Sequence, residues 1–336
     1  MSFLDRIGLE HPVVQAGMGG GLATGALAGE VSAAGGLGTV GILPPERLAR
    51  ELSLARERAG ERPVAANLLV PFARRGHVEA CGQAGARVVV LHGGFRRELT
   101  EQLTERGLLV LQTVGTVPEA KRALGEGADG LVVQGVEAGG HLVGMLPALE
   151  ALAAVQAVTR GHPLLVAGGI AEHDDVRRAL DAGADAAVAG TRFLLTNECA
   201  AHPLYKQRVI AAERTLETRL FGFGWPMRHR VVPNAATDRW CRNAPAGPRA
   251  ILALERLTTP LARLPMSLAG AAHGIQRASV PIFGPSALLE GMPERLVEVS
   301  PLYAGETALR IASDLTAAEA VRRLAGLAPA SPTIQP

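Results

Sequence analysis

The sequence predicts an α/β protein whose eight parallel strands close into one barrel, and three observations lead to this fold class. Short runs of branched apolar residues alternate with segments rich in Ala, Leu, Glu and Arg, as in parallel strands joined by helices. The alternation persists over roughly 200 residues with no boundary between two halves, which favours a (β/α)8 barrel of the TIM type over an open doubly wound sheet. Glycine-rich loops with polar side chains follow several strands, where such a barrel carries its chemistry.

Eight apolar runs give the strands of this barrel. In chain order they are 13–15, 39–43, 64–69, 88–91, 108–113, 130–134, 164–167 and 186–189. Helices are predicted where Ala and Leu recur at helical spacing and a glycine follows. The helix candidates are 25–34, 45–59, 118–126, 146–158 and 174–182.

Residues 36–41 read GLGTVG and match the GxGxxG pattern of dinucleotide-binding loops. That fingerprint requires a strand before it and a helix after it, whereas here the helix comes first and the strand follows. We therefore reject a dinucleotide-binding interpretation of these glycines. They are better explained as the end of a helix that packs closely on a strand.

The pattern changes after Thr191. Helical stretches at 204–220, 249–262 and 265–276 are broken by segments rich in Pro and Gly, such as FGFGWP and IFGPS. We interpret 201–305 as a smaller, mainly helical cap, inserted after the eighth strand and packed over the mouth of the barrel formed by 1–200. Residues 307–324 predict a closing helix that stops at Gly326, so that 306–336 return to the barrel and end in a frayed tail.

The composition is that of an ordinary globular enzyme of 336 residues. The net charge is +2, from 34 basic and 32 acidic residues, which gives no electrostatic case for nucleic acid or a membrane surface. The first residues do not have the pattern of a secretory signal, and no apolar run reaches the length of a membrane span, so we expect neither feature. The three cysteines are too few and too scattered for a disulfide framework or a metal site. We therefore expect a cytoplasmic protein without a metal.

The chemistry is predicted at the end of the sixth strand. The loop after it, EAGGH, brings its glycines and then His141 to the mouth of the barrel. Glycines let the backbone approach a flat ligand, and an imidazole can donate or accept a proton near neutral pH. The alternative interpretation is a structural histidine in a glycine-rich turn. His92 ends the fourth strand at the same mouth and is a second candidate for contact with a substrate.

A phosphate-bearing cofactor is predicted from the last two strand ends. Gly168 and Gly169 follow the seventh strand, and Gly190 and Thr191 follow the eighth, where barrels commonly bind phosphate through backbone N–H groups. Each pair alone could be a tight turn, but consecutive strand ends favour phosphate. Two further polar groups, Asn67 in the third strand and Gln134 in the sixth, need partners if they are buried. Amides suit the edge of a flavin ring, and the alternative is that each bonds nearby backbone.

Together these residues resemble the nitronate monooxygenases, also called 2-nitropropane dioxygenases, which are FMN-dependent TIM barrels. The resemblance covers nearly the whole chain. It is carried by the glycine-rich N-terminal segment, DGLVVQGVEAGGH, PLLVAGGIAEHDDV, AVAGTRF, LFGFGWPMRHRVV and PLYAGE. It implies that FMN is bound by Gly17, Met18, Asn67, Gln134, Gly139, Gly140, Gly168, Gly169, Val188, Ala189, Gly190 and Thr191. It also implies that His141 is the catalytic residue and that Tyr303 lines the substrate pocket.

The chain departs from the family pattern in three places. It has Gly17 where the family usually has proline, and Glu172 and His173 where the family usually has an Asp-Gly pair. The spacing from His141 to the next glycine, Gly144, is longer than usual. These departures leave the flavin site intact and leave the identity of the substrate open.

The resemblance implies oxidation of an alkyl nitronate, such as propionate 3-nitronate, by FMN and dioxygen to a carbonyl compound and nitrite. One alternative is an NAD(P)H-dependent flavin reductase of the same superfamily, acting on enoyl-ACP or quinone. Another is a flavin-binding protein without catalytic activity. The expected partners are a small-molecule substrate and dioxygen, and a homodimer remains open. Six further histidines are expected on the surface or in loops, namely His11, His77, His162, His202, His229 and His273. No carboxylate pair or serine elbow suggests hydrolysis.

Overall fold

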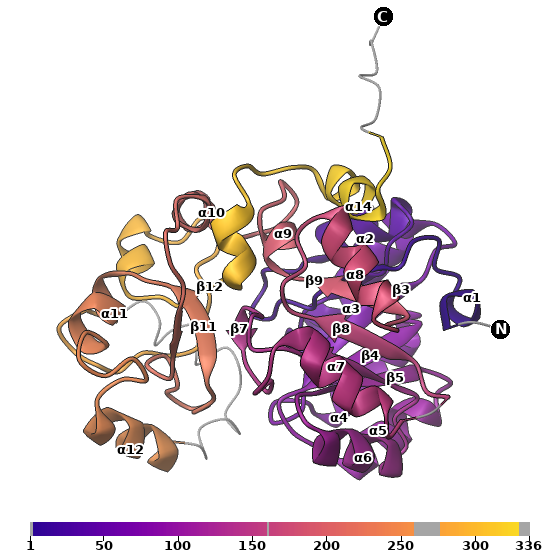
Figure 1. Ribbon diagram of the computed structural model, residues 1–336, viewed down its shortest axis with the longest axis horizontal. Coiled ribbons are helices and arrows are strands. Elements are labelled where there is room, and N and C mark those ends of the chain that lie inside the picture. Colours follow the sequence, from indigo (N-terminus) through magenta and orange to yellow (C-terminus); the bar gives the residue numbers. More distant parts are fainter. Residues whose placement is uncertain (1–2, 160, 259–275, 329–336) are drawn as a thin grey trace, which may run out of the picture.

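The computed structural model describes residues 3–159, 161–258 and 276–328 (Figure 1). Its main sheet has eight parallel strands in the order β1-β9-β8-β6-β5-β4-β3-β2. Their bounds are β1 Val13–Gln15, β2 Gly38–Val40, β3 Val64–Leu69, β4 Val88–His92, β5 Leu109–Val114, β6 Gly130–Gln134, β8 Leu164–Ala167 and β9 Ala186–Ala189. A parallel bridge between Val14 and Leu37 links β1 to the chain just before β2. The predicted barrel is therefore confirmed, with the two ends of the sheet joined by this bridge.

Five of the strands have the predicted bounds, and β2 is the one that differs most. It was predicted at 39–43 but ends at Val40, because the next residue turns toward the neighbouring loop. There the backbone N–H of Gly41 donates to the carbonyl of Ala23, 3.0 Å away. A Cβ on Gly41 would lie 2.1 Å from the carbonyl oxygen of Met18. Close approach of two loops at the mouth, which sequence periodicity does not report, ends the strand early.

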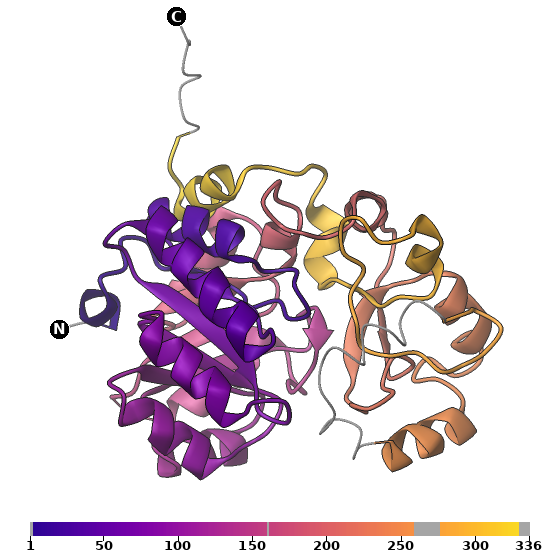
Figure 2. The same cartoon turned by 180° about the vertical axis from the view of Figure 1, so that it is seen from behind.

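Helices surround the barrel in the predicted alternation (Figures 1 and 2). Their bounds are α2 Gly25–Ala33, α3 Pro45–Ala59, α4 Arg75–Gln83, α5 Arg97–Thr104, α6 Val117–Gly125, α7 Ala148–Gln156 and α8 His173–Asp181. Thr24 and Thr116 begin α2 and α6, because each hydroxyl accepts a hydrogen bond from a backbone N–H of the first turn. The predicted helices match these within two residues.

One end of the barrel interior is filled by side chains. A buried cluster combines inward-facing residues of the strands, such as Val14, Leu111 and Leu165, with Phe3 and Ile7 of α1 (Phe3–Ile7). Helix α1 thus packs against the barrel core near the N-terminus. The opposite end, where the strands finish, is left for the loops that carry the polar residues.

A second, antiparallel sheet, which the sequence did not predict, combines three strands of the segment after β9 with one short strand from the loop after β6. It consists of β10 (Leu216–Thr218), β11 (His229–Val232), β12 (Leu302–Tyr303) and β7 (Gly140–His141). Helices α10 (Pro203–Ile210), α11 (Ala235–Trp240) and α12 (Arg249–Leu257) belong to the same part of the chain, beside the barrel in Figure 1. The short strand β7 comes from the loop after β6 and pairs with β11. This sheet therefore joins the barrel to the segment that follows it.

Two predicted helices were wrong in their extent. The helix predicted at 204–220 ends at Ile210, because the chain pairs with β11 from Leu216 onward and this pairing overrides local helix propensity. The helix predicted at 307–324 divides into a 3₁₀ turn, η3 (Glu306–Arg310), and α14 (Ala317–Ala325). Leu315 forms a bridge with Thr196 between the two, which excludes a continuous helix.

The structure bears out the end of the closing helix. Thr316 and Glu319 form a capping box at the start of α14, and Gly326 ends it in the left-handed conformation, with φ of 74°. The predicted helix at 265–276 lies outside the described residues except for Gln276, and the predicted tail lies outside them from residue 329 onward. None of the described helices is long and apolar enough to cross a membrane.

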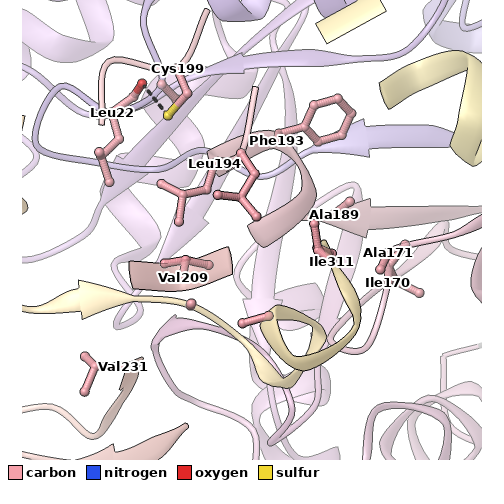
Figure 3. Packing of buried hydrophobic residues seen from close by; sticks show 14 of the residues in the cluster. Leu22, Ile170, Ala171, Ala189, Phe193, Leu194, Cys199, Val209, Val231 and Ile311 are labelled. Atoms are coloured by element: carbon pink, nitrogen blue, oxygen red, sulfur yellow. Dashed lines mark hydrogen bonds between the residues drawn. The ribbon is translucent and has the colours of Figure 1, made fainter. Parts of the chain in front are cut away.

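A large buried cluster holds the last strands, α9 (Thr191–Leu194) and the C-terminal segment together (Figure 3). Phe193 and Leu194 of α9 belong to the same cluster as Ile170 and Ala171 after β8, and Ile311 after η3. The loops after β8 and β9 are thus fixed by apolar packing from behind. This packing leaves their backbone at the mouth in a defined position.

Candidate active site

A cavity of about 1140 Å³ opens at the ends of the barrel strands. This volume exceeds the roughly 300–1,000 Å³ of a site for one small ligand, so it has room for a cofactor and a substrate together. Of the residues predicted for the site, these line it: Gly17, Met18, Asn67, His92, Gln134, Gly139, Gly140, His141, Gly168, Gly169, Val188, Gly190, Thr191 and Tyr303. Ala189 does not line it. Its side chain is buried in the barrel wall and its carbonyl accepts from the N–H of Ala16.

His141 lies in β7, against the second sheet. In the register of that sheet it faces His229 of β11. Its imidazole stacks on the indole of Trp225, with ring centroids 3.9 Å apart and planes 27° apart. The Nε2 atom of His141 is buried and has no hydrogen-bond partner among the described residues. A buried imidazole nitrogen without a partner is costly, which points to a ligand as the missing partner.

His141 is neutral near neutral pH. Burial lowers the pKa of its imidazole well below 6.5, and the nearby His229 and His92 lower it further. Burial also lowers the pKa of His92 to about 4 and that of His229 to about 4. The three imidazoles therefore form an uncharged group, in which His141 can accept a proton or donate a hydrogen bond.

His229 was predicted on the surface or in a loop, and this was wrong. Its side chain is completely buried, its Nδ1 donates to the carbonyl of Met227, and its Nε2 accepts from the N–H of Phe221. These two bonds fix the tautomer and leave no free nitrogen. His77 and His202 are also buried, whereas His162 is exposed as predicted and His273 lies outside the described residues. The apolar residues Val231 and Val232 shortly after His229 were the sequence signal that could have indicated a buried strand.

The amides of Gln134 and Asn67 bond protein backbone at the cavity wall. Gln134 Nε2 donates to the carbonyl of His141 at 3.2 Å, and its Oε1 accepts from the N–H groups of Val143 at 2.7 Å and Gly144 at 3.4 Å. Gln134 thus holds the loop that carries His141. The Nδ2 of Asn67 donates to the carbonyl of Val90 at 3.1 Å. The alternative interpretation of both amides, bonding to backbone, is therefore realised, although both also line the cavity.

Aromatic residues make up one wall of the cavity. Trp225 packs edge-on against Phe72, with ring centroids 5.3 Å apart, and the Tyr303 ring lies 5.2 Å from that of His141. The Tyr303 hydroxyl donates to the carbonyl of Pro285 at 3.0 Å. Sequence reasoning missed Trp225 and Phe72 as members of the site, although Trp225 belongs to the GWP segment. The stacked indole of Trp225 excludes water from one face of His141.

The loops after β8 and β9 present unpaired backbone donors. Gly168 and Gly169 have φ of 121° and 76°, a conformation that glycine adopts without strain. Among the described residues, no acceptor is found for the N–H groups of Gly168, Gly169, Ile170, Gly190 and Thr191, all of which line the cavity. The Thr191 hydroxyl accepts from the N–H of Gly305 at 2.9 Å, which leaves its own proton free to donate. Converging N–H groups of this kind suit an anion such as a phosphate.

The opposite part of the cavity suits a flat ring. Thr39 lines it, and its fully buried hydroxyl has no hydrogen-bond partner in the part of the chain that the structure describes. A Cβ on Gly17 would lie 2.1 Å from the Cβ of Asn67. Nearer the loops after β8 and β9, a Cβ on Gly139 would lie 2.4 Å from the N atom of Gly305, which bonds Thr191. The backbone is therefore packed so closely that only glycine fits at these positions. The residues present fit a large planar cofactor that carries a phosphate, as the resemblance to flavoproteins implies.

Comparison with known proteins agrees with this geometry. The sequence model of the family described as nitronate monooxygenase matches residues 2–81 and 72–246. A Mycobacterium tuberculosis protein named (3aS,4S,5R,7aS)-5-hydroxy-7a-methyl-1-oxo-octahydro-1H-indene-4-carboxyl-CoA dehydrogenase is 32% identical over 242 residues, 70% of this chain and 66% of that protein. The match thus covers slightly less than two thirds of that relative.

Two further matches carry nitroalkane-related names. The nitronate monooxygenase of Pseudomonas aeruginosa is 31% identical over 258 residues, which cover 61% of this chain and 72% of that protein. The crystal structure of a nitroalkane oxidase from Streptomyces ansochromogenes superposes with a TM-score of 0.74 at 28% identity, covering 97% of each chain. The fold and the sequence thus point to the same group of enzymes.

Proposed function

The chain belongs to the nitronate monooxygenase family of flavin-dependent oxidoreductases, and we propose that it is an FMN enzyme that oxidises alkyl nitronates. With dioxygen, a substrate such as propionate 3-nitronate would give a carbonyl compound and nitrite. The observation that carries this proposal is the position of His141 in a cavity large enough for cofactor and substrate, where its buried Nε2 has no partner from residues 3–159, 161–258 or 276–328. A merely structural histidine would be hydrogen-bonded.

The residues proposed to hold FMN divide into two groups. The ring would lie over Gly17, Met18 and Asn67, beside the buried Thr39 hydroxyl, for which no partner is found among the described residues. Gly139 packs against Gly305, which bonds Thr191, and would contact the cofactor nearer its phosphate. The phosphate would take the backbone N–H groups of Gly168, Gly169, Gly190 and Thr191. Gln134, Gly140 and Val188 line the cavity between these groups of residues and would contact the cofactor from the barrel wall.

When bound, the flavin supplies the electron transfer between the substrate and dioxygen. The chain's own residues bind and orient the substrate. Neutral His141 can donate a hydrogen bond to the negative nitro group of a nitronate, or accept the α-proton of a neutral nitroalkane. Trp225 and Tyr303 cover His141 and keep water from the reacting carbon. His92 and Tyr303 are the proposed substrate contacts.

The proposal is tested by the flavin absorbance of the FMN-loaded protein without oxygen. Propionate 3-nitronate should bleach the flavin, and admission of oxygen should restore its colour and release nitrite. NADH and NADPH should leave the flavin oxidised. Bleaching by a nicotinamide, with none by the nitronate, would contradict the proposal.

A second candidate function is an NAD(P)H-dependent flavin reductase that acts on a neutral carbonyl compound such as an enoyl thioester or quinone. The observation in its favour is the lack of a fixed positive charge at His141. The groups that act electrostatically on its imidazole are His229 and His92, which are neutral at neutral pH. Among the described lining residues, the arginines are Arg47 and Arg277. An uncharged substrate would suit such an environment, and the same anaerobic experiment separates the two functions.

A further inference from the structure

We propose that Arg310 is a positioning residue for the phosphate of the cofactor, because its guanidinium fixes the turn at Gly168 and Gly169 that would bind this phosphate. The inference rests on the proposed use of FMN. Arg310 itself does not line the cavity.

Arg310 reaches the turn from the far end of the chain. It is the last residue of η3, and its Nη2 donates to the carbonyl of Gly169 at 2.8 Å. The same guanidinium bonds both carboxylate oxygens of Asp175, with Nη1 3.2 Å from Oδ1 and Nη2 3.1 Å from Oδ2. One side chain thus links the glycine turn to the first turn of α8.

Asp175 in turn holds the other end of the loop. Its Oδ2 accepts from the N–H groups of Ala171 at 2.9 Å and Glu172 at 3.0 Å, and only 2% of its side chain is exposed. Burial alone would raise the pKa of this carboxyl, but the bonds from Arg310, Ala171 and Glu172 outweigh burial and lower it. The carboxylate is therefore charged at neutral pH and keeps Arg310 in place.

The rest of the loop is fixed by neighbours, so that Gly169 depends on Arg310. Arg192 donates to the carbonyl of Ala171 at 3.1 Å and pairs with Glu172, which also pairs with Arg323. Ile311, next to Arg310, belongs to the buried cluster that contains Ala171 (Figure 3). The carbonyl of Gly169 has Arg310 as its donor, and orienting this carbonyl orients its own planar peptide unit, whose N–H is that of Ile170. Ile170 N–H is one of the donors at the cavity for which no acceptor is found among the described residues.

This arrangement predicts an effect specific to the phosphate. Loss of the guanidinium frees the turn and removes a positive charge behind it, but leaves the ring-binding part of the cavity unchanged. A hydrogen bond from a charged group commonly changes an equilibrium roughly tenfold to a hundredfold. We expect Arg310→Ala to weaken FMN binding by this factor. Binding of riboflavin, which has the same ring but no phosphate, should change less than about threefold.

The experiment measures dissociation constants of FMN and riboflavin from flavin fluorescence, using the full chain. Arg178→Ala is the matched control, because Arg178 pairs with the same Asp175 carboxylate but has no bond to Gly169. It should leave the preference for FMN unchanged. Arg310→Gln is the second variant, which keeps a side-chain donor but loses the charge, for use if Arg310→Ala lacks a native melting transition. It too should lower the preference for FMN.

Two outcomes would overturn the inference. If the wild type prefers FMN and the Arg310 variants keep that preference, Arg310 does not position the phosphate site. If the Arg310 variants lose FMN and riboflavin equally, or if Arg178→Ala has the same effect, the residue acts only on the stability of the fold. A wild type that binds riboflavin as tightly as FMN would overturn both the inference and the proposed cofactor. The two failures are thus distinguishable.

Discussion

His141 and His229 lie opposite each other on two antiparallel strands that come from different parts of the chain, with ring centroids 5.5 Å apart. His141 belongs to the loop after a barrel strand, and His229 belongs to the second sheet. Because β7 pairs with β11, the position of the proposed catalytic residue depends on both parts of the molecule.

Replacing His141 with Asn should abolish most of the activity without loss of flavin. Turnover of propionate 3-nitronate should fall by roughly two to four orders of magnitude, the range for loss of a general acid or base. Flavin absorbance of the purified variant should match that of the wild type. The control is His162→Asn, which changes an exposed histidine and should leave kcat/KM unchanged. Wild-type turnover in His141→Asn would remove the assigned role.

Replacing Trp225 with Ala should change the pH dependence of the reaction. The stacked indole keeps water from His141, so its removal should raise the imidazole pKa toward its ordinary value of 6.5. Since the neutral imidazole is the active form, kcat/KM of the variant should decline as the pH falls through about 6.5, whereas the wild type should decline only at lower pH. Trp240→Ala, outside the cavity, is the control. Superimposable profiles for the wild type and Trp225→Ala would contradict this account.

Replacing Gln134 with Leu should disorder the loop of His141. The change removes the bonds to His141, Val143 and Gly144 and leaves their buried backbone groups unpaired, at a cost of about 1–3 kcal/mol in the free energy of unfolding. We expect a lower kcat with flavin still bound. Urea unfolding and steady-state kinetics provide the measurements, and Gln102→Leu on the exposed face of α5 should be silent. If the variant has unchanged stability and kcat, the loop keeps its conformation without the hydrogen bonds from Gln134.

Replacing Gly17 with Ala should lower the melting temperature of the protein or its affinity for the cofactor. The new Cβ would lie 2.1 Å from that of Asn67, so one of the two segments must move. Melting temperature and flavin content of the purified variant test this. Gly125→Ala is the control, because a Cβ there has no atom within 4 Å. Equal behaviour of the two variants would show that the contact relaxes without consequence. The same contact also concerns the proline that the family usually has at this position. Proline has a Cβ, which would meet Asn67 in the present backbone.

Stability should decline at mildly acidic pH because of the buried histidines. The pKa of His229 is lowered from 6.5 to about 4, and that of His92 likewise, so between these values the unfolded chain binds more protons than the folded one. Their contribution is complete above pH 6.5 and is lost as the pH falls toward 4. Unfolding free energies from urea titrations at several pH values should show this slope, and His229→Leu should reduce it. His162→Asn, which changes an exposed histidine, should leave the slope intact, and a slope unaffected by His229→Leu would exclude His229 as its origin.

Much of the fold could be predicted because the barrel is encoded locally. The strand of Gly130–Gln134 and the helix of Pro45–Ala59 have the bounds that apolar runs and helical spacing indicate. Local patterns failed where distant segments pair. Leu216 belongs to a helical pattern in the sequence, yet it lies in a strand because Val231 offers a partner. The departure at Glu172 and His173 is also explained only in three dimensions, since Glu172 pairs with Arg192 and Arg323, and His173 bonds the carbonyl of Leu324.

The sequence by itself determined the barrel, the family and the glycine-rich loops that would hold a phosphate. Each of these depends on short stretches of contiguous residues, whose identity and spacing are visible in the sequence. Only the tertiary structure decided what surrounds His141. Trp225, His229 and Tyr303 lie 84 or more residues further along the chain and meet it through a sheet that local periodicity does not reveal. The charge of the imidazole was decided in the same way. Its pKa depends on burial and on neighbouring charges, and these are properties of the assembled cavity.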